Sequence, residues 1–248
     1  MIPRRKRACY NAPDYRRPKF EVNTVDMPAD QFPPQIGELK EFLAAHQIAA
    51  SDDQIKKLDL YRRLLWSWND RMNLTRHTTL EKFVGRDVVD SHELSKLLEQ
   101  GDRVLDVGTG GGVPGVVVAI LRPDLTMAVC DSTQKKARAV EAMVADLELP
   151  IRVFPNRAEE VLEITTFDTL VARGLAPLAK VLTWLKPHWD AFDRLLLIKG
   201  RSWADERTDA RHLGLLRGRE LRKAASYQTP GNDAESVILS VAPGTDSD

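Results

Sequence analysis

The sequence predicts an α/β fold: a doubly wound, mostly parallel sheet preceded by a helical cap and closed by an antiparallel hairpin. Three observations lead to this prediction. Apolar residues recur at helical spacing between residues 36 and 98, short apolar runs alternate with helical segments between residues 104 and 198, and two strand-like runs follow near the C-terminus. Strands that alternate with helices are typical of a parallel sheet covered on both faces.

The N-terminal cap is expected over residues 35–100 and consists of three helices. The first begins near Ile36, the second takes its N-cap from Ser51-Asp52-Asp53, and the third runs from about Leu80 to Leu98. In the first two segments, these apolar residues recur at helical spacing: Leu39, Phe42, Leu43, Ile55, Leu58, Leu65 and Trp68. Such a stripe buries one face of each helix.

The principal domain is expected over residues 101–243. Short apolar runs predict buried strands at 104–107, 126–130, 151–154, 167–172 and 195–198. Helices are expected between them at 114–121, 135–147 and 178–186, the first opened by Pro114, which is tolerated in a first helical turn. The runs Glu220–Tyr227 and Ser236–Val241 flank a loop with Pro230-Gly231, which predicts a hairpin at one edge of the sheet.

Residues 1–34 differ from the rest of the chain, because basic residues and prolines replace the apolar content that packing requires. We expect this basic, proline-rich tail to be disordered. It is either a solvated tail or an arm that holds RNA phosphates, and the first interpretation is favoured. Met27 is an alternative start of the chain, in which event the tail is an artefact of start-site choice.

The overall composition excludes several classes of protein. Lys plus Arg and Asp plus Glu both number 36, so bulk positive charge cannot attract nucleic acid, although a local basic face remains open. Cys9 and Cys130 form no disulfide framework or metal cluster, and the five histidines lack metal-ligand spacing. No apolar run spans a membrane, and Met1–Tyr10 lacks the apolar stretch of a secretory signal. We expect a soluble, cytoplasmic protein without a metal.

A glycine-rich loop follows the first predicted strand and predicts a nucleotide site. Gly108, Gly110 and Gly112 leave the strand where ligands bind in doubly wound sheets. Glycine permits positive φ and removes side chains that would block a ligand from the backbone. A tight turn without a ligand is the alternative, and the three alternating glycines argue against it.

The glycines alone do not identify the nucleotide. Read from Gly110, through Gly112 and Gly115, the loop satisfies the G-x-G-x-x-G pattern of dinucleotide enzymes. Asp106 lies just before the glycines, where a methyltransferase uses an acid near the methionine ammonium group. The terminal hairpin also suits the class I methyltransferase variant of the Rossmann-like fold better than the dinucleotide one. We therefore predict S-adenosyl-L-methionine as the cofactor.

Two further acids follow the next strands. Asp131 ends the second strand, where an acid accepts hydrogen bonds from ribose hydroxyls in both enzyme classes. Its alternative role is the N-cap of the following helix. Glu159 follows the third strand, where an adenine ring would lie, and is otherwise an ordinary first-turn helix acid.

An ordered set of short motifs covers roughly residues 36 to 200, each weak on its own. In sequence order they are Trp68-Asn69, Asn73-Leu74-Thr75, Asp90-Ser91, Asp106 through Gly115, Arg122-Pro123, Asp131-Ser132, Arg157-Ala158-Glu159-Glu160, Arg173 with Ala176, and Lys199-Gly200. This set resembles the bacterial 16S ribosomal RNA guanine-N7 methyltransferases, also called glucose-inhibited division protein B.

The resemblance implies a role for each matched position. It places Gly108 and Val113 in the cofactor loop, and Ala158 and Glu159 beside the adenine. It also places Arg173 at the pocket shared by cofactor and substrate. The candidate catalytic set comprises Arg173, Asn73, Asp90 and Lys199; the last three lie at the mouth of the site, with roles not separated. Otherwise Asn73 ends a helix, Asp90 is a solvated acid and Arg173 is paired on the surface.

The chain also departs from the family pattern. Arg173-Gly174-Leu175-Ala176 stands where the family usually has Arg-Ala-Phe-Ala, and Asp87 stands where it usually has His. Gly111 is a smaller departure, at a position where the family shows small or proline residues. Loss of an aromatic at Leu175 alters what a base can stack on. The departures therefore affect the target more than the cofactor.

The resemblance implies methyl transfer to guanine N7 in 16S rRNA, with the 30S subunit as partner and a monomeric enzyme. N7 carries a lone pair and no proton, so the reaction needs alignment of the reactants and no general base. The alternatives are a methyltransferase with another substrate, a ribosome assembly factor without turnover, and an NAD-dependent oxidoreductase. Replacement of Arg173 by Ala is expected to abolish transfer and to leave the fold intact.

The segment after the last predicted parallel strand concentrates basic residues. They contact RNA phosphate or form the solvated face of a surface helix and edge strand, and the second interpretation is favoured. The residues are Arg201, Arg207, Arg211, Arg217, Arg219, Arg222 and Lys223.

Overall fold

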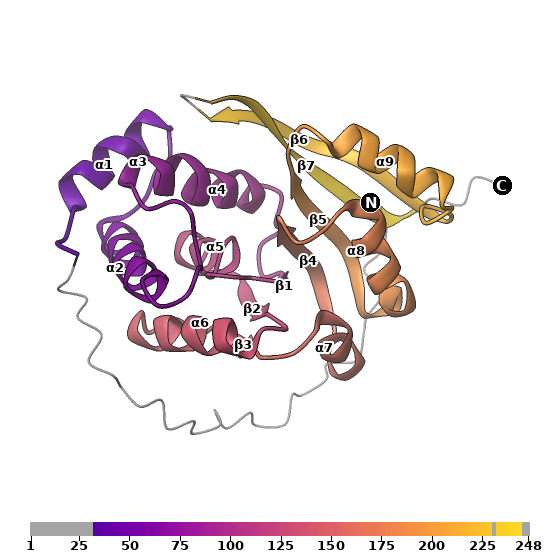
Figure 1. The fold of residues 1–248 in the computed structure, drawn as a ribbon, viewed down its shortest axis with the longest axis horizontal. Coiled ribbons are helices and arrows are strands. Elements are labelled where there is room, and N and C mark those ends of the chain that lie inside the picture. Colours follow the sequence, from indigo (N-terminus) through magenta and orange to yellow (C-terminus); the bar gives the residue numbers. More distant parts are fainter. Residues whose placement is uncertain (1–31, 230–231, 245–248) are drawn as a thin grey trace.

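The computed structural model describes residues 32–229 and 232–244, so the expectation for the N-terminal tail lies almost wholly outside the described residues. Within these residues a seven-stranded sheet has the order β3-β2-β1-β4-β5-β7-β6, with helices on both of its faces (Figure 1). The strands are β1 (Arg103–Val107), β2 (Thr126–Cys130), β3 (Arg152–Phe154), β4 (Phe167–Arg173), β5 (Phe192–Lys199), β6 (Arg219–Thr229) and β7 (Asn232–Pro243). The predicted fold class is confirmed.

The helices fall into a cap and two covering layers. They are α1 (Ile36–Ala45), α2 (Asp52–Asn69), α3 (Leu80–Lys82), the π-helical segment η2 (Phe83–Val88), α4 (Val89–Ser95), α5 (Gly115–Leu121), α6 (Gln134–Asp146), α7 (Ala158–Ile164), α8 (Leu178–Leu185), the 3₁₀ segment η3 (Lys186–Ala191) and α9 (Trp203–His212). No helix in the described part of the chain is long and apolar enough to cross a membrane.

The cap is fastened to the sheet domain by the start of α2. Ser51 is the predicted N-cap: its hydroxyl accepts from the Gln54 backbone N–H, and the Gln54 side chain accepts from the Ser51 N–H. This reciprocal pair satisfies two of the backbone donors that a helix start leaves unpaired. The Gln54 amide also donates to the carbonyls of Ile120 and Leu121, at the end of α5. One side chain therefore caps its own helix and binds the carbonyl end of a second.

The third cap helix differs from the prediction in two ways. It ends at Ser95, three residues before the predicted Leu98, and η2 interrupts its α-helical hydrogen bonding. The π-helical segment contains Asp87, and Asp90 follows it in α4; both side chains are completely buried. A π-helical turn is rare and is often found at functional sites. Apolar periodicity did not predict it, because one inserted residue barely changes the pattern.

The strand order reverses beside β1, which pairs in parallel with both β2 and β4. The C-terminal ends of these strands therefore border a crevice at a topological switch point, where ligands bind in such sheets. On the other side β7 runs antiparallel to β5, and β6 antiparallel to β7. Dinucleotide-binding sheets have the order 3-2-1-4-5-6, so the antiparallel β7 beside β5 departs from that fold.

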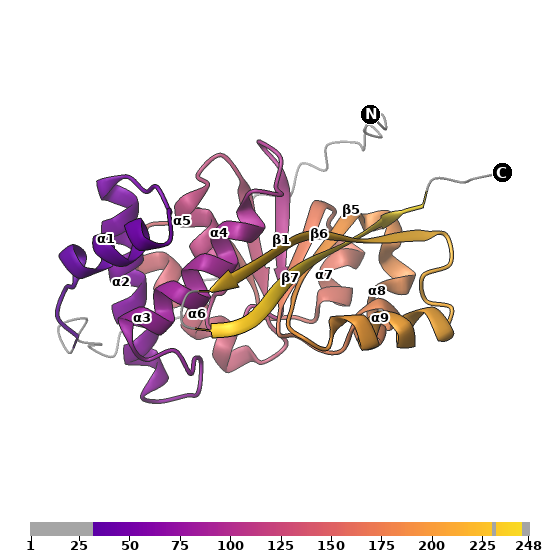
Figure 2. The same ribbon diagram turned by 90° about the horizontal axis from the view of Figure 1, so that it is seen from above.

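The terminal hairpin is confirmed and is longer than predicted. It runs along the outer edge of the sheet from the helical cap to α9 (Figure 2). Two helices, α7 and α9, were not predicted as elements. The first buries Ala158, Val161 and Leu162 at helical spacing, but its seven residues are too few for a clear periodicity, and the second buries only Ala210 and offers no apolar stripe.

The two faces of the sheet carry separate apolar cores. One core joins α1, α2, α4, α5 and α6 to side chains such as Val104 and Val129, and the other joins α7 and α8 to side chains such as Leu105 and Leu170. Neighbouring residues of β1 thus enter opposite cores, because successive side chains of a strand point to opposite faces. Burial on both faces explains why the parallel strands are continuous apolar runs.

Replacement of Ser51 by Ala removes the capping bond of α2. We expect the free energy of unfolding to fall by about 1 kcal/mol in urea titrations. Thr133→Ala is the matched control, because Thr133 is the N-cap of α6 without a side-chain capping bond. Equal losses in the two variants would contradict this account of the cap.

Candidate active site

Two adjoining hollows lie at the C-terminal ends of the central strands. The first, of about 90 Å³, is bounded by the ends of β1 and β2, the start of α7 and one face of α8. The second, of about 330 Å³, is bounded by the glycine loop, Leu74, Thr75 and Arg173. They share Gly108, Asp131, Ser132 and Leu175. Together they form one continuous site at the switch point of the sheet.

The glycine loop requires glycine for reasons of conformation and of space. Gly108 and Gly110 have φ of +68° and +60°, a region that side chains other than glycine rarely adopt. A Cβ on Gly108 would also lie 2.4 Å from the Leu175 side chain. The loop backbone therefore faces the site directly, with Leu175 packed against it.

Asp106 supports the loop from beneath and is completely buried. Its Oδ2 accepts from the Thr109 hydroxyl at 2.6 Å and from the Gly115 N–H at 2.9 Å. A Cβ at Gly115 would lie 2.8 Å from that oxygen, so glycine is needed where α5 meets β1. Asp106 Oδ1 is buried without a hydrogen-bond partner among the described residues. Burial raises the pKa of Asp106 to about 6, against the lowering effect of its two donors.

Asp131 holds the loop from the end of β2. One carboxylate oxygen accepts from the Gly110 N–H at 3.0 Å, and the other from the Thr133 N–H at 2.7 Å. The N-cap of α6 is Thr133, so Asp131 binds next to the helix start without being its N-cap residue. Each carboxylate oxygen can accept a second hydrogen bond, so Asp131 remains able to bind ligand hydroxyls.

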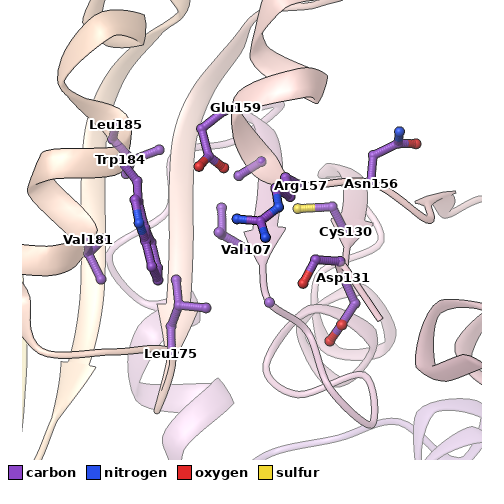
Figure 3. Close-up of a pocket in the computed structure, with 13 residues that line it drawn as sticks. Val107, Cys130, Asp131, Asn156, Arg157, Glu159, Leu175, Val181, Trp184 and Leu185 are labelled. Carbon is purple, nitrogen blue, oxygen red and sulfur yellow. The ribbon is translucent and has the colours of Figure 1, made fainter. Parts of the chain in front are cut away.

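The first hollow is a narrow slot between α8 and the ends of β1 and β2 (Figure 3). Trp184 and Leu175 form one wall, Cys130 and Asp131 face them, and the Glu159 carboxylate points into the space between. Burial raises the pKa of the Cys130 thiol to about 12, so Cys130 is an inert apolar wall. A slot with apolar walls and the polar side chains of Asp131, Arg157 and Glu159 offers both the flat surface and the hydrogen-bonding groups that suit a purine ring.

Arg173 ends β4 and lies between two completely buried carboxylates. Its guanidinium donates to Asp87 at 2.6 Å and to Asp90 at 3.1 Å. Burial by itself lowers the pKa of Arg173, but the two carboxylates outweigh it and raise the pKa above the ordinary value. The side chain is 21% exposed and lines the second hollow. Arg173 therefore presents a fixed cation to that hollow.

Two side chains from other elements complete this cluster. The Tyr227 hydroxyl on β6 donates to Asp90 at 2.7 Å. The His77 Nδ1 lies 2.8 Å from Asp87, at the same oxygen that binds Arg173. The cap, the centre of the sheet and the terminal hairpin therefore meet at one cluster of charged side chains.

Most of the predicted site residues lie together. Seven of them line the two hollows: Gly108, Gly110, Val113, Asp131, Ala158, Glu159 and Arg173. Asp106 lies beneath the loop, Gly112 continues the loop with φ of +106°, and Asp90 supports Arg173 from a fully buried position. The interpretation of Asp90 as a solvated acid is therefore wrong.

Asn73 and Lys199 line neither hollow. Asn73 is exposed, next to Leu74 and Thr75, which do line the second hollow. Lys199 donates to the Ala176 carbonyl at 2.6 Å and forms an ion pair with Glu206 at 2.7 Å. These bonds fasten the turn after β4 to α9, so the geometry gives Lys199 a structural role and does not support its predicted place in catalysis.

Sequence reasoning missed several site residues. Trp184 faces the slot from α8, and Tyr61 donates from α2 to the Gly111 carbonyl at 2.8 Å. Both belong to helices whose apolar pattern looked like ordinary core packing. Tyr227 joins Asp90 across 137 positions, and no local signal connects residues so far apart. Asp87, a departure from the family pattern, supplies the second carboxylate for Arg173.

Known proteins resemble this chain over most of its length. Residues 54–230 match the sequence model of a family described as rRNA small subunit methyltransferase G. A ribosomal RNA small subunit methyltransferase G from Rhodopirellula baltica is 48% identical over 170 residues, which cover 68% of this chain and 74% of that protein. Its counterpart from Chromobacterium violaceum is 38% identical over 205 residues, covering 82% of this chain and 95% of that protein.

Arg173 has a structural role that its replacement would reveal. The expectation that Arg173→Ala leaves the fold intact disagrees with the structure, since Asp87 would remain buried without its arginine and Asp90 would keep only Arg86, 3.9 Å away. We expect the free energy of unfolding to fall by roughly 3–5 kcal/mol, measured by urea denaturation. Arg76→Ala is the exposed control, expected to change it by less than about 0.5 kcal/mol. An Arg173→Ala variant as stable as the control would refute this role.

The buried Asp106 predicts a pH dependence of stability. In the folded protein Asp106 keeps its proton up to about pH 6, whereas the ordinary pKa of the group is 3.8. The contribution of Asp106 to the free energy of unfolding is therefore full below pH 3.8 and is lost as the pH rises through 6. Asp106→Asn cannot ionise. The stability of the variant relative to the native protein is therefore expected to rise by about 2.4 kcal/mol between pH 4 and pH 7. Denaturation series at several pH values measure this, and parallel profiles would contradict it.

Proposed function

The chain belongs to the rRNA small subunit methyltransferase G family, and on this premise we propose that it methylates guanine N7 in the 16S RNA of the small subunit, with S-adenosylmethionine as methyl donor. The observation that carries the proposal is the continuous site in which the glycine loop lies beside a fixed arginine. We further propose that one copy of the chain acts on an assembled 30S subunit.

The residues present suit the cofactor. Asp131 is the proposed acceptor for its ribose hydroxyls, and Ala158 and Glu159 flank the slot proposed for its adenine. The unpartnered Oδ1 of Asp106 is a buried acceptor beneath the loop, and a ligand ammonium close to the loop would offset its charge. The open backbone at Gly108 and Gly110 lets a ligand approach the loop closely.

S-adenosylmethionine supplies the methyl group as an electrophile on a sulfonium. The guanine N7 carries a lone pair and no proton, so the protein needs no general base at this step. Asp87 and Asp90 both bind Arg173, so their geometric task is to hold that side chain in place. The task of the chain is to align the two reactants and exclude water.

We propose that Arg173 orients the target base. Two of its N–H groups bind carboxylates, and the side chain remains partly exposed in the second hollow. Arginine is the common partner of the guanine O6 and N7 edge. A contact to O6 would place the base while N7 stays available. Asp90 and Tyr227 act through Arg173 and are positioning residues in this proposal.

Two alternatives are kept because Gly174-Leu175 departs from the family pattern. In the first, the chain methylates another substrate on the same fold; in the second, it binds the cofactor and assists ribosome assembly without turnover. Leu175 lies at the boundary of the two hollows, so its identity affects how a target base meets the cofactor. Both alternatives use the same cofactor slot.

The proposal predicts methylation of 30S subunits that lack the modification. Incubation with labelled S-adenosylmethionine is expected to label 16S RNA at guanine N7, and equilibrium dialysis to show binding of this cofactor in preference to NAD. Asp131→Asn is expected to raise the cofactor Kd by roughly 10- to 100-fold, the effect of weakening hydrogen bonds to a charged acceptor. Asp205→Asn, at an exposed position on α9, is the matched control and should change neither measurement.

Three outcomes would contradict the proposal. Cofactor binding without label in 16S RNA would favour the assembly factor, and label in another substrate would favour the first alternative. Preferential binding of NAD would remove the methyltransferase assignment.

A further inference from the structure

A second pair of hollows lies away from the cofactor site and is rich in cations. The larger, of about 460 Å³, is lined by η3, the end of α9 and the start of β6. The adjoining hollow shares His212, Gly214, Arg217 and Arg219 with it. We call the two together the basic hollow; its cationic or titratable members are Lys186, Arg211, His212, Arg217 and Arg219.

The charge of the basic hollow is one-sided. Among the described residues that line it, none is acidic. Neighbouring basic side chains behave differently: Arg222 pairs with Glu220, and Lys223 lies 3.7 Å from Glu235. Four cations and a histidine that converge without a lining acid repel one another, and an anion between them relieves that repulsion. The predicted solvated face therefore contains a concave, anion-attracting part.

One cation of the basic hollow is held in a fixed orientation. The Arg219 guanidinium stacks on the Trp189 ring at 4.4 Å from its centre. Stacking leaves the N–H groups at the edge of the guanidinium free to donate, the arrangement that suits phosphate oxygens. Burial lowers the pKa of Arg219, with Asp190 as the opposing acidic influence, so this cation is poorly compensated within the protein.

A simpler explanation covers only part of the basic hollow. Arg211 and His212 lie in the last turn of α9, where positive side chains offset the helix dipole. That effect falls off within one turn. It does not account for Lys186 or Arg219, which come from other elements, nor for the stacking on Trp189.

The basic hollow and the active site lie at opposite ends of the strands. Arg219 begins β6, next to the end of β7, whereas Tyr227 near the end of β6 reaches the Arg173 cluster. Tyr227 lies eight residues after Arg219 on β6, and at about 3.3 Å per residue the two positions are roughly 25 Å apart. The hairpin therefore connects the two sites along the outer edge of the sheet (Figure 2).

We propose that the basic hollow is a second RNA-binding site, which holds backbone phosphates of the substrate RNA while the target base occupies the active site. Phosphate contacts position a protein on nucleic acid without reading its sequence. This inference rests on the proposed function, because it takes RNA as the substrate. Because the net charge of the chain is zero, electrostatic attraction of RNA requires a local patch of positive charge of this kind.

The double variant Arg211→Gln/Arg217→Gln tests the site with two exposed side chains, so folding is not at risk. We expect the KM for 30S subunits to rise roughly tenfold near physiological salt, with kcat and the cofactor Kd unchanged. Each lost phosphate contact also reduces the slope of log affinity against log salt by about 0.7–0.9, so the slope should fall by roughly 1.5. Filter binding of 30S subunits at several salt concentrations measures it.

The matched control is Lys56→Gln/Lys82→Gln, which removes two exposed positive charges from the helical cap. An equal loss in the control would overturn the proposal in favour of bulk charge, as would an unchanged KM and salt slope in the test variant. Inorganic phosphate binding that the test variant loses while its 30S affinity stays intact would assign the hollow to a free anion and also overturn it. Failure of the proposed function is a separate result: the native chain would then label no 16S RNA.

Discussion

Arg173 lies between Asp87 and Asp90, two carboxylates that solvent does not reach, and its guanidinium binds both. Burial of two negative charges in a protein interior is costly unless a cation and hydrogen bonds offset it. Here the cation comes from β4, the two carboxylates come from η2 and α4 of the cap, and the Tyr227 hydroxyl comes from β6 of the hairpin. These three parts of the molecule are therefore held in one arrangement, and the second hollow lies directly against it.

The glycine loop depends on a similar use of acids, at the ends of the neighbouring strands. Asp106 binds the loop from below and Asp131 binds it from the side, each through backbone N–H groups. The acid beneath has a pKa raised to about 6 by burial, while the acid beside the loop keeps capacity for ligand hydroxyls. Loop and arginine are thus fixed by separate carboxylates, so the proposed cofactor side and the proposed substrate side of the site can be tested independently.

Leu175 is where the two sides meet. It packs over Gly108, borders both hollows, and replaces the aromatic residue usual at this place in the family that the sequence resembles. A leucine offers no flat ring for a base to stack on. In the proposed function, alignment of the target base would then depend more on the fixed Arg173 and on contacts of the RNA elsewhere, such as those proposed for the basic hollow at the opposite end of the strands.

The sequence alone determined the succession of strands along the chain and most of the helices, the capped start of α2, the glycine loop with Asp106 and Asp131, and the terminal hairpin. These features depend on periodicity, turn chemistry and local spacing, which neighbouring residues carry. Tertiary structure decided the rest. Only packing joins Asp87, Asp90, Arg173 and Tyr227, pairs Lys199 with Glu206 away from the hollows, and gathers Lys186 and Arg219 around the basic hollow. Buried charges choose their partners by proximity in space, and proximity between distant segments is not encoded in any local pattern.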